Sequence, residues 1–200
     1  MHKFDFSFLK SMMVPTSFLD LTNTIYALRK EEELIKGTYP NIFTNLQKIA
    51  IVQSVKGSNA IEGIVTTDKR IEEIVNQNSS PLNHNEKEIY GYKNALNIVH
   101  TQHDNLSFEE KTILNLHQTL LSFSELPNKS VYKKQDNVIR ERHADGMSFI
   151  RWMPTSAKDT DFAMKQLIFA YDDARCDSSI NQLLLIPCVI LDFLCIHPFD

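Results

Sequence analysis

Residues 183–200 read LLLIPCVILDFLCIHPFD, and this stretch decides how the whole chain is interpreted. The first fourteen residues, Leu183 to Ile196, are the strongest apolar run of the sequence, and they include Pro187 and Asp192. A membrane span needs about 20 apolar residues, so the run predicts a core helix. Apolar residues lie nearly all round this helix, which predicts burial on every side, and Pro187 predicts either a kink or a later helix start.

The sequence continues from this run into His197-Pro198-Phe199-Asp200. A helix that is buried all round needs further chain to pack against. We therefore expect the 200 residues to be the N-terminal part of a longer domain, with a natural end at Asp200 as the alternative.

Glycine and proline are scarce, with 5 and 7 residues among 200. Few turn residues favour long helices over many short strands. The one good strand signal is Val138-Ile139 and Phe149-Ile150 on either side of Asp145-Gly146, a favoured hairpin turn. The expected fold class is all-α, a helical bundle with one β-hairpin.

The net charge and the cysteine pattern indicate which partners and which cellular compartment to expect. The formal net charge is −4, so the chain lacks the excess of positive charge that attracts nucleic acid or anionic lipid. Neither nucleic acid nor a membrane is therefore an expected partner. The cysteines Cys176, Cys188 and Cys195 form no close pair, and the start lacks a secretory leader, which together predict a cytoplasmic location. The histidines have no metal-ligand spacing, so no zinc site is expected within the chain.

Capping residues and apolar spacing predict the other helices. The first is expected to end near Gly37 and the second near Lys56-Gly57, while Phe4, Phe6 and Phe8 belong to an arm that packs on the domain. The expected helix starts are Thr16 or Ser17, Asn41, Thr67, Asn83 with Glu86, Ser107 with Glu110, Ser156 or Asp159, and Ser178 or Ser179.

A short segment, Ser58-Asn59-Ala60-Ile61-Glu62-Gly63, lies between the second and third expected helices. Glycines stand on both sides of it, at Gly57 and Gly63. This pattern predicts a turn, or a single short helix whose C-cap is Gly63.

Four features together resemble the Fic family. Residues 197–200 resemble the start of its signature, His-Pro-Phe-x-Asp/Glu-Gly-Asn-Gly-Arg-x-x-Arg, and residues 58–63 resemble its inhibitory motif, Ser/Thr-x-x-x-Glu-Gly/Asn. Residues 132–139, YKKQDNVI, resemble the aromatic-Arg-x-x-Gln-Asn-x-Ile segment that opens the core, with Lys133 and Asp136 in place of Arg and Gln. The hairpin lies where the family has its target-binding flap, and Asp192 stands where many members have His.

The resemblance implies a domain organisation and an activity. Residues 1–105 would be an N-terminal helical region that carries the inhibitory motif, and residues 106–200 the N-terminal part of the Fic core. The implied reaction transfers AMP from ATP, with Mg²⁺, to the hydroxyl of a Ser, Thr or Tyr in a target protein. His197 suits the base that this reaction needs, because a neutral imidazole accepts a proton. Pro198 would fix the chain direction, and Phe199 would be a buried anchor.

Glu62 is implied to be the inhibitor of this reaction. A carboxylate at a helix end can pair with an arginine that would otherwise hold the γ-phosphate of ATP, so the α-phosphate would be misplaced for in-line attack. Ser58 would tie the first turn, as an N-cap or through a bond to the core, and Gly63 would cap the segment.

A non-catalytic helical regulatory or protein-interaction module is the alternative function. The sequence also leaves open the target protein and a second copy of the chain as a partner. It does not decide between transfer of AMP, of another nucleotide moiety or of phosphate, and removal of AMP.

We expect the 200 residues by themselves to be inactive in AMP transfer, because the resemblance places the phosphate cradle, the metal carboxylate and both arginines after Asp200. Incubation with labelled ATP, Mg²⁺ and a cell lysate should leave the chain and the lysate unlabelled. Strong labelling that depends on His197 would contradict this expectation.

Overall fold

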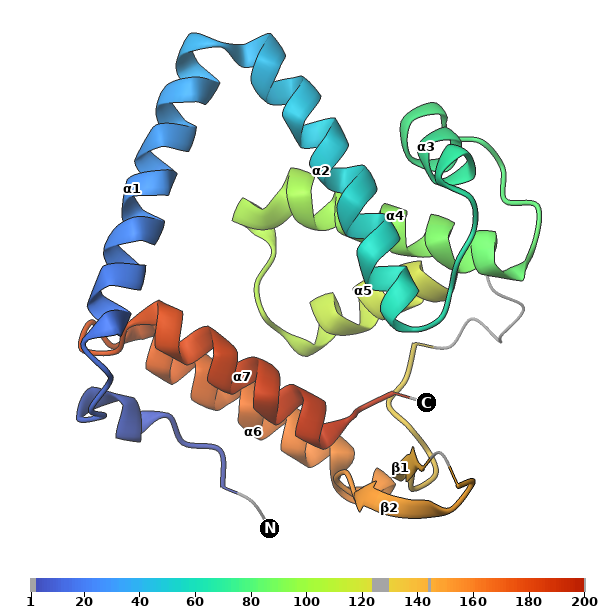
Figure 1. Cartoon of the computed structure of the whole chain (residues 1–200). Helices are drawn as coiled ribbons and strands as arrows, with labels where there is room; N and C mark the ends of the chain where they lie inside the picture. The colour runs from blue at the N-terminus through green and yellow to red at the C-terminus, as the bar shows by residue number, and fades with distance from the viewer. Residues whose placement is uncertain (1–2, 124–129, 144, 200) are drawn as a thin grey trace. The chain divides into compact units, whose positions relative to one another are not determined.

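The computed structural model describes residues 3–123, 130–143 and 145–199. Within these ranges it contains seven α-helices and one two-stranded hairpin, which confirms the all-α class with a single hairpin (Figure 1). The chain divides into two compact units, each with its own core. One unit comprises residues 1–14, 108–111 and 131–200, which we call the hairpin unit; the other comprises residues 15–107 and 112–130, which we call the helical unit.

The helical unit is built from long helices. Its first two, α1 and α2, meet at a bend at Tyr39 and diverge from it as an inverted V (Figure 1). The bounds are α1 Ser17–Thr38, α2 Pro40–Ile61, α3 Asp68–Gln77, α4 His84–Gln102, the 3₁₀ turn His103–Asn105, and α5 Glu110–Leu121, whose first two residues belong to the hairpin unit.

Two expectations about α2 were wrong. It does not begin with Asn41 as its cap, because Pro40 occupies the first helical turn, where its missing N–H costs nothing. It also continues past Gly57 to Ile61. Burial of Val55 and Asn59 on the same side of the helix explains this, since tertiary packing outweighs the roughly 1 kcal/mol cost of an interior glycine.

The core of the helical unit joins α2, α3 and α4. It consists of the buried side chains of Val55, Ile71, Ile74 and Ile89. The expected caps of α3 and α4 are confirmed: the Thr67 hydroxyl accepts the Arg70 N–H at 3.3 Å, and the Asn83 side chain accepts the Glu86 N–H at 3.0 Å. Local caps therefore set where the core helices begin.

A buried ion pair fastens α3 to the start of α4. Glu86 is 2% exposed, and its carboxylate accepts Arg70 Nη2–H at 2.8 Å, Arg70 Nε–H at 3.1 Å, the Leu82 N–H at 2.8 Å and the Thr66 hydroxyl at 3.1 Å. Arg70 also donates to Glu73. The bonds from Arg70, then those from Leu82 and Thr66, outweigh the opposing effect of burial and lower the pKa of Glu86 to about 2.

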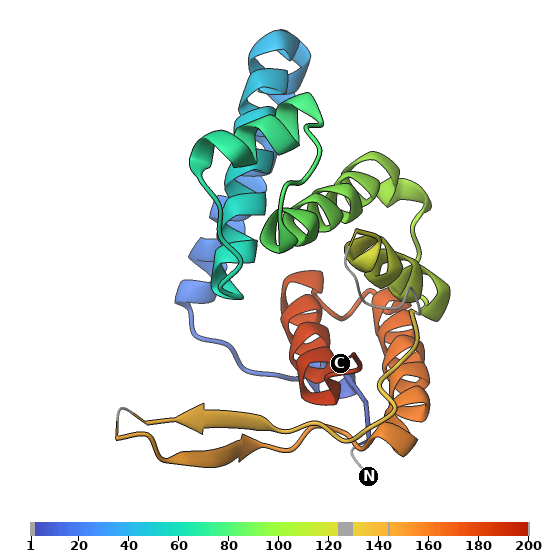
Figure 2. The ribbon, with the colours of Figure 1, turned by 90° about the vertical axis from the view of Figure 1, so that its right-hand side faces the viewer.

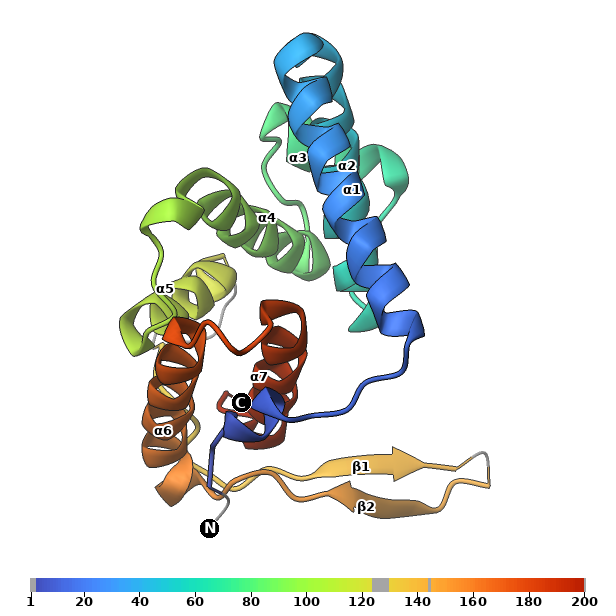
Figure 3. The same ribbon diagram turned by 90° about the vertical axis from the view of Figure 1, so that its left-hand side faces the viewer.

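The hairpin unit pairs two helices with the hairpin and an N-terminal arm (Figures 2 and 3). In the arm, Phe6 is buried as expected, whereas Phe8 is half exposed. Ala163, Met164 and Leu167 are among the buried residues of the first helix of the pair. The bounds are the 3₁₀ turn Ser7–Lys10, β1 Ile139–Arg142, β2 Ser148–Trp152, α6 Ala157–Cys176 and α7 Gln182–Ile196.

The hairpin follows the sequence signal closely. Its strands pair antiparallel, with Arg140 opposite Ile150 and Glu141 opposite Phe149, around the expected Asp145-Gly146 turn. Figure 3 shows the two strands extending together away from α6 and α7. In the described part of the chain, no helix has the length and apolarity needed to cross a bilayer.

The last helix differs from expectation in two respects. Its cap is Asn181, whose side chain accepts the Leu183 N–H at 2.9 Å, and not Ser178 or Ser179. The helix therefore starts later than Ser178 or Ser179 would place it, but Pro187 still lies inside it. The helix is also not buried all round: Leu185, Val189 and Ile196 are buried, but the surface-facing Ile190, Leu191 and Leu194 are 53%, 61% and 58% exposed.

The Glu86 ion pair should dominate the acid stability of the helical unit. Because the folded-state pKa of Glu86 is depressed, its stabilisation is complete above its ordinary pKa near 4.5 and is lost as the pH falls toward about 2. We expect Glu86→Gln to lower the free energy of unfolding at pH 7 by about 2–3 kcal/mol. Urea titrations at several pH values measure both effects.

The matched control is Glu72→Gln, because Glu72 is exposed on α3 and forms no ion pair with any residue that the structure describes. It should leave the unfolding free energy within about 0.5 kcal/mol of the parent chain. Equal effects of the two substitutions would mean that the buried ion pair contributes nothing specific.

Candidate active site

The backbone at the end of α7 presents His197. Its N–H closes the helix by donating to the Phe193 carbonyl at 3.0 Å. The residue then adopts the left-handed conformation, with φ 48° and ψ 67°, and its side chain is exposed. Non-glycine residues rarely adopt positive φ, and such strain is concentrated at functional sites. Pro198 follows and is buried, so the chain turns away from the helix immediately after the histidine.

One nitrogen of the His197 ring is held by neighbours and the other is open. Nδ1 lies 2.9 Å from Asn137 Nδ2 and 3.2 Å from the Phe199 carbonyl oxygen. Nε2 makes no hydrogen bond to a described residue of the hairpin unit. The ring is therefore anchored at Nδ1 and has Nε2 available to a reacting group.

Lys133 joins the segment before the hairpin to the end of α7. Only 3% of the residue is exposed, and its ammonium donates to Asn137 Oδ1 at 2.8 Å and to the Ile196 carbonyl at 3.0 Å. Its backbone N–H donates to the Pro198 carbonyl at 2.8 Å. A cation at the C-terminal end of a helix is also favourable for the helix dipole. Lys133, which stands where the Fic segment has arginine, thus contacts the residues on both sides of His197 in the chain and the side chain of Asn137.

Asp136, in the glutamine position of the same segment, has a different partner. Its carboxylate accepts the Ala157 N–H at 2.7 Å and so caps the start of α6. The expected cap Ser156 occupies the N-cap position, but its hydroxyl donates to Asp159 at 2.5 Å. Residues 132–139 therefore hold both α6 and α7, through Asp136 and Lys133.

Aromatic packing supports the chain after His197. The Phe199 ring is half buried and lies 5.8 Å from the Tyr132 ring, centroid to centroid. The Tyr132 hydroxyl is buried without a hydrogen-bond partner among the described residues. Burial, with the nearby charges of Glu110 and Asp161, raises the pKa of Tyr132 above its ordinary range. Phe199 therefore has the anchoring position expected of it, although part of its surface stays exposed.

A hollow of about 310 Å³ lies beside the end of α7. Aromatic and apolar side chains line most of it, and Asp192, five residues before His197, supplies a carboxylate. Its lining includes Phe4, Trp152, Met153, Asp192, Cys195 and Ile196. It is large enough to receive a side chain from another molecule.

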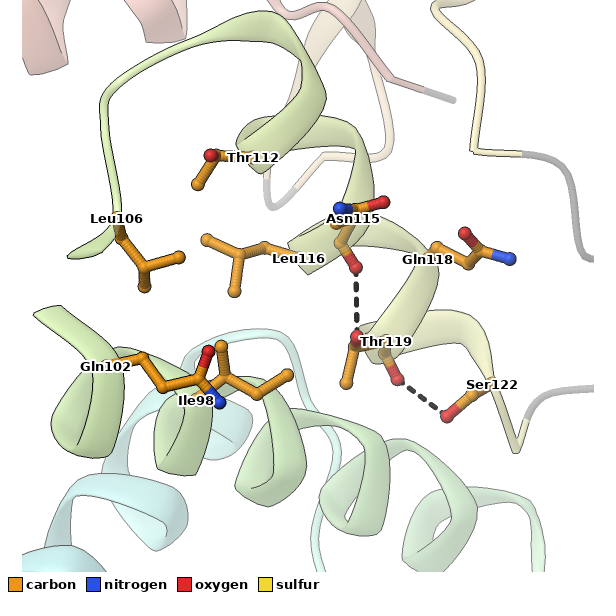
Figure 4. A pocket seen from close by; sticks show the side chains of 9 residues that line it. All are labelled: Ile98, Gln102, Leu106, Thr112, Asn115, Leu116, Gln118, Thr119 and Ser122. Carbon is orange, nitrogen blue, oxygen red and sulfur yellow. Dashed lines mark hydrogen bonds between the residues drawn. The ribbon is translucent and has the colours of Figure 1, made fainter.

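The helical unit holds a second hollow, of about 510 Å³, between α4 and α5 (Figure 4). The helices touch at Gly91, where a side chain would collide with the Leu120 carbonyl, 2.0 Å from an added Cβ. The hollow lies between the part of α4 that follows Gly91 and the facing side of α5. It is lined by neutral groups, including Ile98, Gln102, Asn115 and Thr119. Its described lining residues include no Asp, Glu, His, Lys, Arg or Cys side chain. It is therefore not the candidate active site.

The proposed inhibitory residues lie in the helical unit, at the end of α2. Gly63 has φ 75°, its N–H bonds the Ala60 carbonyl at 3.0 Å, and the Ile64 N–H bonds the Asn59 carbonyl at 3.0 Å. This is a complete Schellman motif, which confirms Gly63 as the cap. The segment is the last turn of a long helix, however, and not a separate short helix.

Ser58 and Glu62 have different environments. The Ser58 hydroxyl accepts a hydrogen bond from the Tyr92 hydroxyl of α4 at 2.9 Å. Ser58 lies inside α2, so the expected N-cap is wrong. The bond stays within residues 1–105, and no bond from Ser58 to a described residue of 106–200 is present. Glu62 is exposed, and no hydrogen bond or ion pair joins its carboxylate to a described residue of its own unit. Its charge is therefore available to another cation.

The described residues bring together no group of three or more His, Cys, Asp or Glu side chains that could hold a metal ion. Around His197 the neighbours are a lysine, an amide and main-chain carbonyls. These groups do not fit a Mg²⁺ site, which needs carboxylate oxygens. Asp200 lies outside the described residues.

The left-handed backbone of His197 gives a stability prediction. We expect His197→Gly to be more stable than His197→Ala by about 1 kcal/mol, because both lose the ring contacts but only glycine adopts positive φ without cost. In a chain of this size the difference is about 2–4 °C in Tm, which thermal unfolding measures.

Lys165 is the control position, because it is exposed in the interior of α6. There the order should reverse, with Lys165→Gly less stable than Lys165→Ala. A His197→Gly chain that is no more stable than His197→Ala would rule out strain at this position.

No protein-family model and no curated protein matches the sequence. Solved structures do match. A Fic domain containing signaling protein from Bacteroides thetaiotaomicron superimposes with a TM-score of 0.72 at 18% identity, over 88% of this chain and 65% of that one. A Fic family protein from Desulfovibrio desulfuricans superimposes with a TM-score of 0.72 at 16% identity, over 94% of this chain and 54% of that one. The chain thus spans less than two thirds of either neighbour's length, and it has the Fic fold.

Proposed function

We propose that the chain is part of a Fic family protein that transfers AMP from ATP to a hydroxyl of a target protein. Residues 106–200 would be the N-terminal part of its catalytic core. The observation that carries the proposal is the His197-Pro198-Phe199 segment at the end of α7 in a Fic fold, with the imidazole exposed and held by one nitrogen only.

His197 would be the general base of this reaction. Its Nε2 would take the proton of the target hydroxyl as that oxygen attacks the α-phosphorus of ATP. A bond forms between the hydroxyl oxygen and the α-phosphorus, the bond to the β-phosphate oxygen breaks, and pyrophosphate leaves. A positioned base of this kind typically contributes about 10²–10⁴-fold to the rate.

The geometry around His197 supports precise placement of that base. To act as a base at Nε2, the neutral ring must carry its proton on Nδ1, where the Phe199 carbonyl, 3.2 Å away, can accept it. The strained backbone fixes the direction of the side chain. The hollow lined by Trp152 and Asp192 would receive part of the target next to the histidine. ATP would be accompanied by Mg²⁺, and the residues around His197 supply no ligand set for that ion.

Glu62 would inhibit the same reaction. Its exposed carboxylate, held at a fixed helix end by the Schellman motif, has the charge needed to occupy an arginine that binds the γ-phosphate. The hydrogen bond from Tyr92 to Ser58 would fix the turn that carries it. Inhibition and chemistry would then reside on different helices, so they can be separated by mutation.

The test uses the whole protein expressed from its gene, with labelled ATP. Glu62→Gly and the neutral isostere Glu62→Gln should both raise labelling at least tenfold, since a shielded charge-assisted contact is worth about 1.5–3 kcal/mol. His197→Ala should abolish labelling, also in the Glu62→Gly background.

Glu72→Gln is the control for loss of a carboxylate elsewhere in the helical unit, and it should leave labelling unchanged. If Glu62→Gly has no effect, residues 58–63 are an ordinary helix end. If the His197→Ala protein is labelled as strongly as the Glu62→Gly protein, the proposed role of His197 in the reaction is wrong. A non-catalytic protein-interaction module then explains the fold better.

A further inference from the structure

The hydrogen bonds around His197 specify which ring nitrogen carries the proton. We infer that Lys133, acting through Asn137, holds His197 in the tautomer with its proton on Nε2, which is the form that donates rather than accepts at the open nitrogen. For its consequence in catalysis, this inference rests on the proposed role of His197 as a base. The tautomer itself is a property of the hairpin unit.

The argument begins at the buried ammonium of Lys133. An ammonium has three donors and no acceptor, so each polar group that it contacts must accept. Two of the groups that it contacts are the Ile196 carbonyl at 3.0 Å and the Asn137 side chain at 2.8 Å. The Asn137 atom toward Lys133 must therefore be Oδ1, because turning the amide over would place its NH₂ group against the ammonium.

The orientation of Asn137 then determines the bond to His197. With Oδ1 directed at Lys133, Nδ2 lies 2.9 Å from His197 Nδ1 and 3.4 Å from the Phe199 carbonyl oxygen. Nδ2 has two hydrogens and no acceptor, so Nδ1 must supply a lone pair. In a neutral imidazole the proton is consequently on Nε2.

The opposite tautomer has an acceptor but conflicts with Asn137. A proton on Nδ1 could be donated to the Phe199 carbonyl, 3.2 Å away, and Nε2 would then be free to act as a base. That proton would also face the NH₂ group of Asn137. Flipping Asn137 removes this conflict but directs its NH₂ group at Lys133, which is only 3% exposed. Lys133 and Asn137 are therefore positioning residues that bias the resting site against its basic form.

Asparagine-to-aspartate substitution at position 137 reverses the bias. An aspartate accepts both from Lys133 and from a proton on Nδ1, so Asn137→Asp should invert the tautomer ratio and leave Nε2 unprotonated. The ratio is read from the imidazole ¹⁵N resonances of histidine-labelled chain in alkaline buffer, where the ring is neutral. His197→Gln identifies the resonance by its disappearance.

In the parent chain we expect Nε2–H to exceed Nδ1–H by at least about tenfold, and in Asn137→Asp we expect the reverse. Lys133→Met frees the amide of Asn137 to turn and should give a mixture, whereas Lys134→Met, at the exposed neighbouring position, should match the parent. Near-ultraviolet circular dichroism checks that each variant is folded.

A parent ring with its proton on Nδ1, or folded variants that all share the parent ratio, would overturn the inference. None of these readouts uses labelling by ATP, so the tautomer and the proposed function can fail independently. If both hold, Asn137→Asp should also raise the AMP-transfer rate of the whole protein in the Glu62→Gly background.

Discussion

The buried ammonium of Lys133 is the constraint on which the candidate site depends. It lies between the Ile196 carbonyl at the end of α7 and the side chain of Asn137 and donates to both. The backbone N–H of the same residue donates to the Pro198 carbonyl. A buried charge without hydrogen-bond partners is strongly unfavourable. Separating the ammonium from the Ile196 carbonyl and the Asn137 side chain therefore costs free energy. The left-handed turn at His197 persists because the chain on both sides of it is held in this way.

The helical unit uses the same strategy for a different purpose. A buried carboxylate, Glu86, gathers donors from Arg70, Thr66 and Leu82 and so fixes the start of α4 against α3. The end of α2 is then held by the bond from Tyr92 to Ser58 and closed by the Schellman motif at Gly63. Rigid support of this kind lets an exposed carboxylate such as Glu62 keep a defined position without partners of its own in the unit.

Local signals in the sequence were sufficient for much of the fold. Thr67 and Asn83 cap their helices through bonds that span three residues, and Asp145-Gly146 forms the turn of the hairpin. Pattern reasoning failed where tertiary packing decided the outcome. The continuation of α2 past Gly57 and the exposure of one side of α7 both depend on what packs against those helices.

The site was harder to predict than the fold, because its decisive contacts span long separations in sequence. His197, Pro198 and Phe199 were identified by motif, but Asn137 contacts His197 across 60 residues and Lys133 contacts Ile196 across 63. Asp136 caps α6 from 21 residues away. Spacing carries no signal for such contacts, so the roles of Lys133, Asp136 and Asn137 become visible only in the structure.

Amide hydrogen exchange tests the central claim most directly, namely that the segment around Lys133 is locked to the end of α7. The Lys133 N–H is bonded to the Pro198 carbonyl, whereas the neighbouring Lys134 is exposed. The account predicts that the Lys133 amide exchanges at least about 100-fold more slowly than the Lys134 amide, because exchange requires the hydrogen bond between Lys133 and Pro198 to break. Equal and rapid exchange of the two amides would contradict it, since the ring of His197 would then lack the support described above.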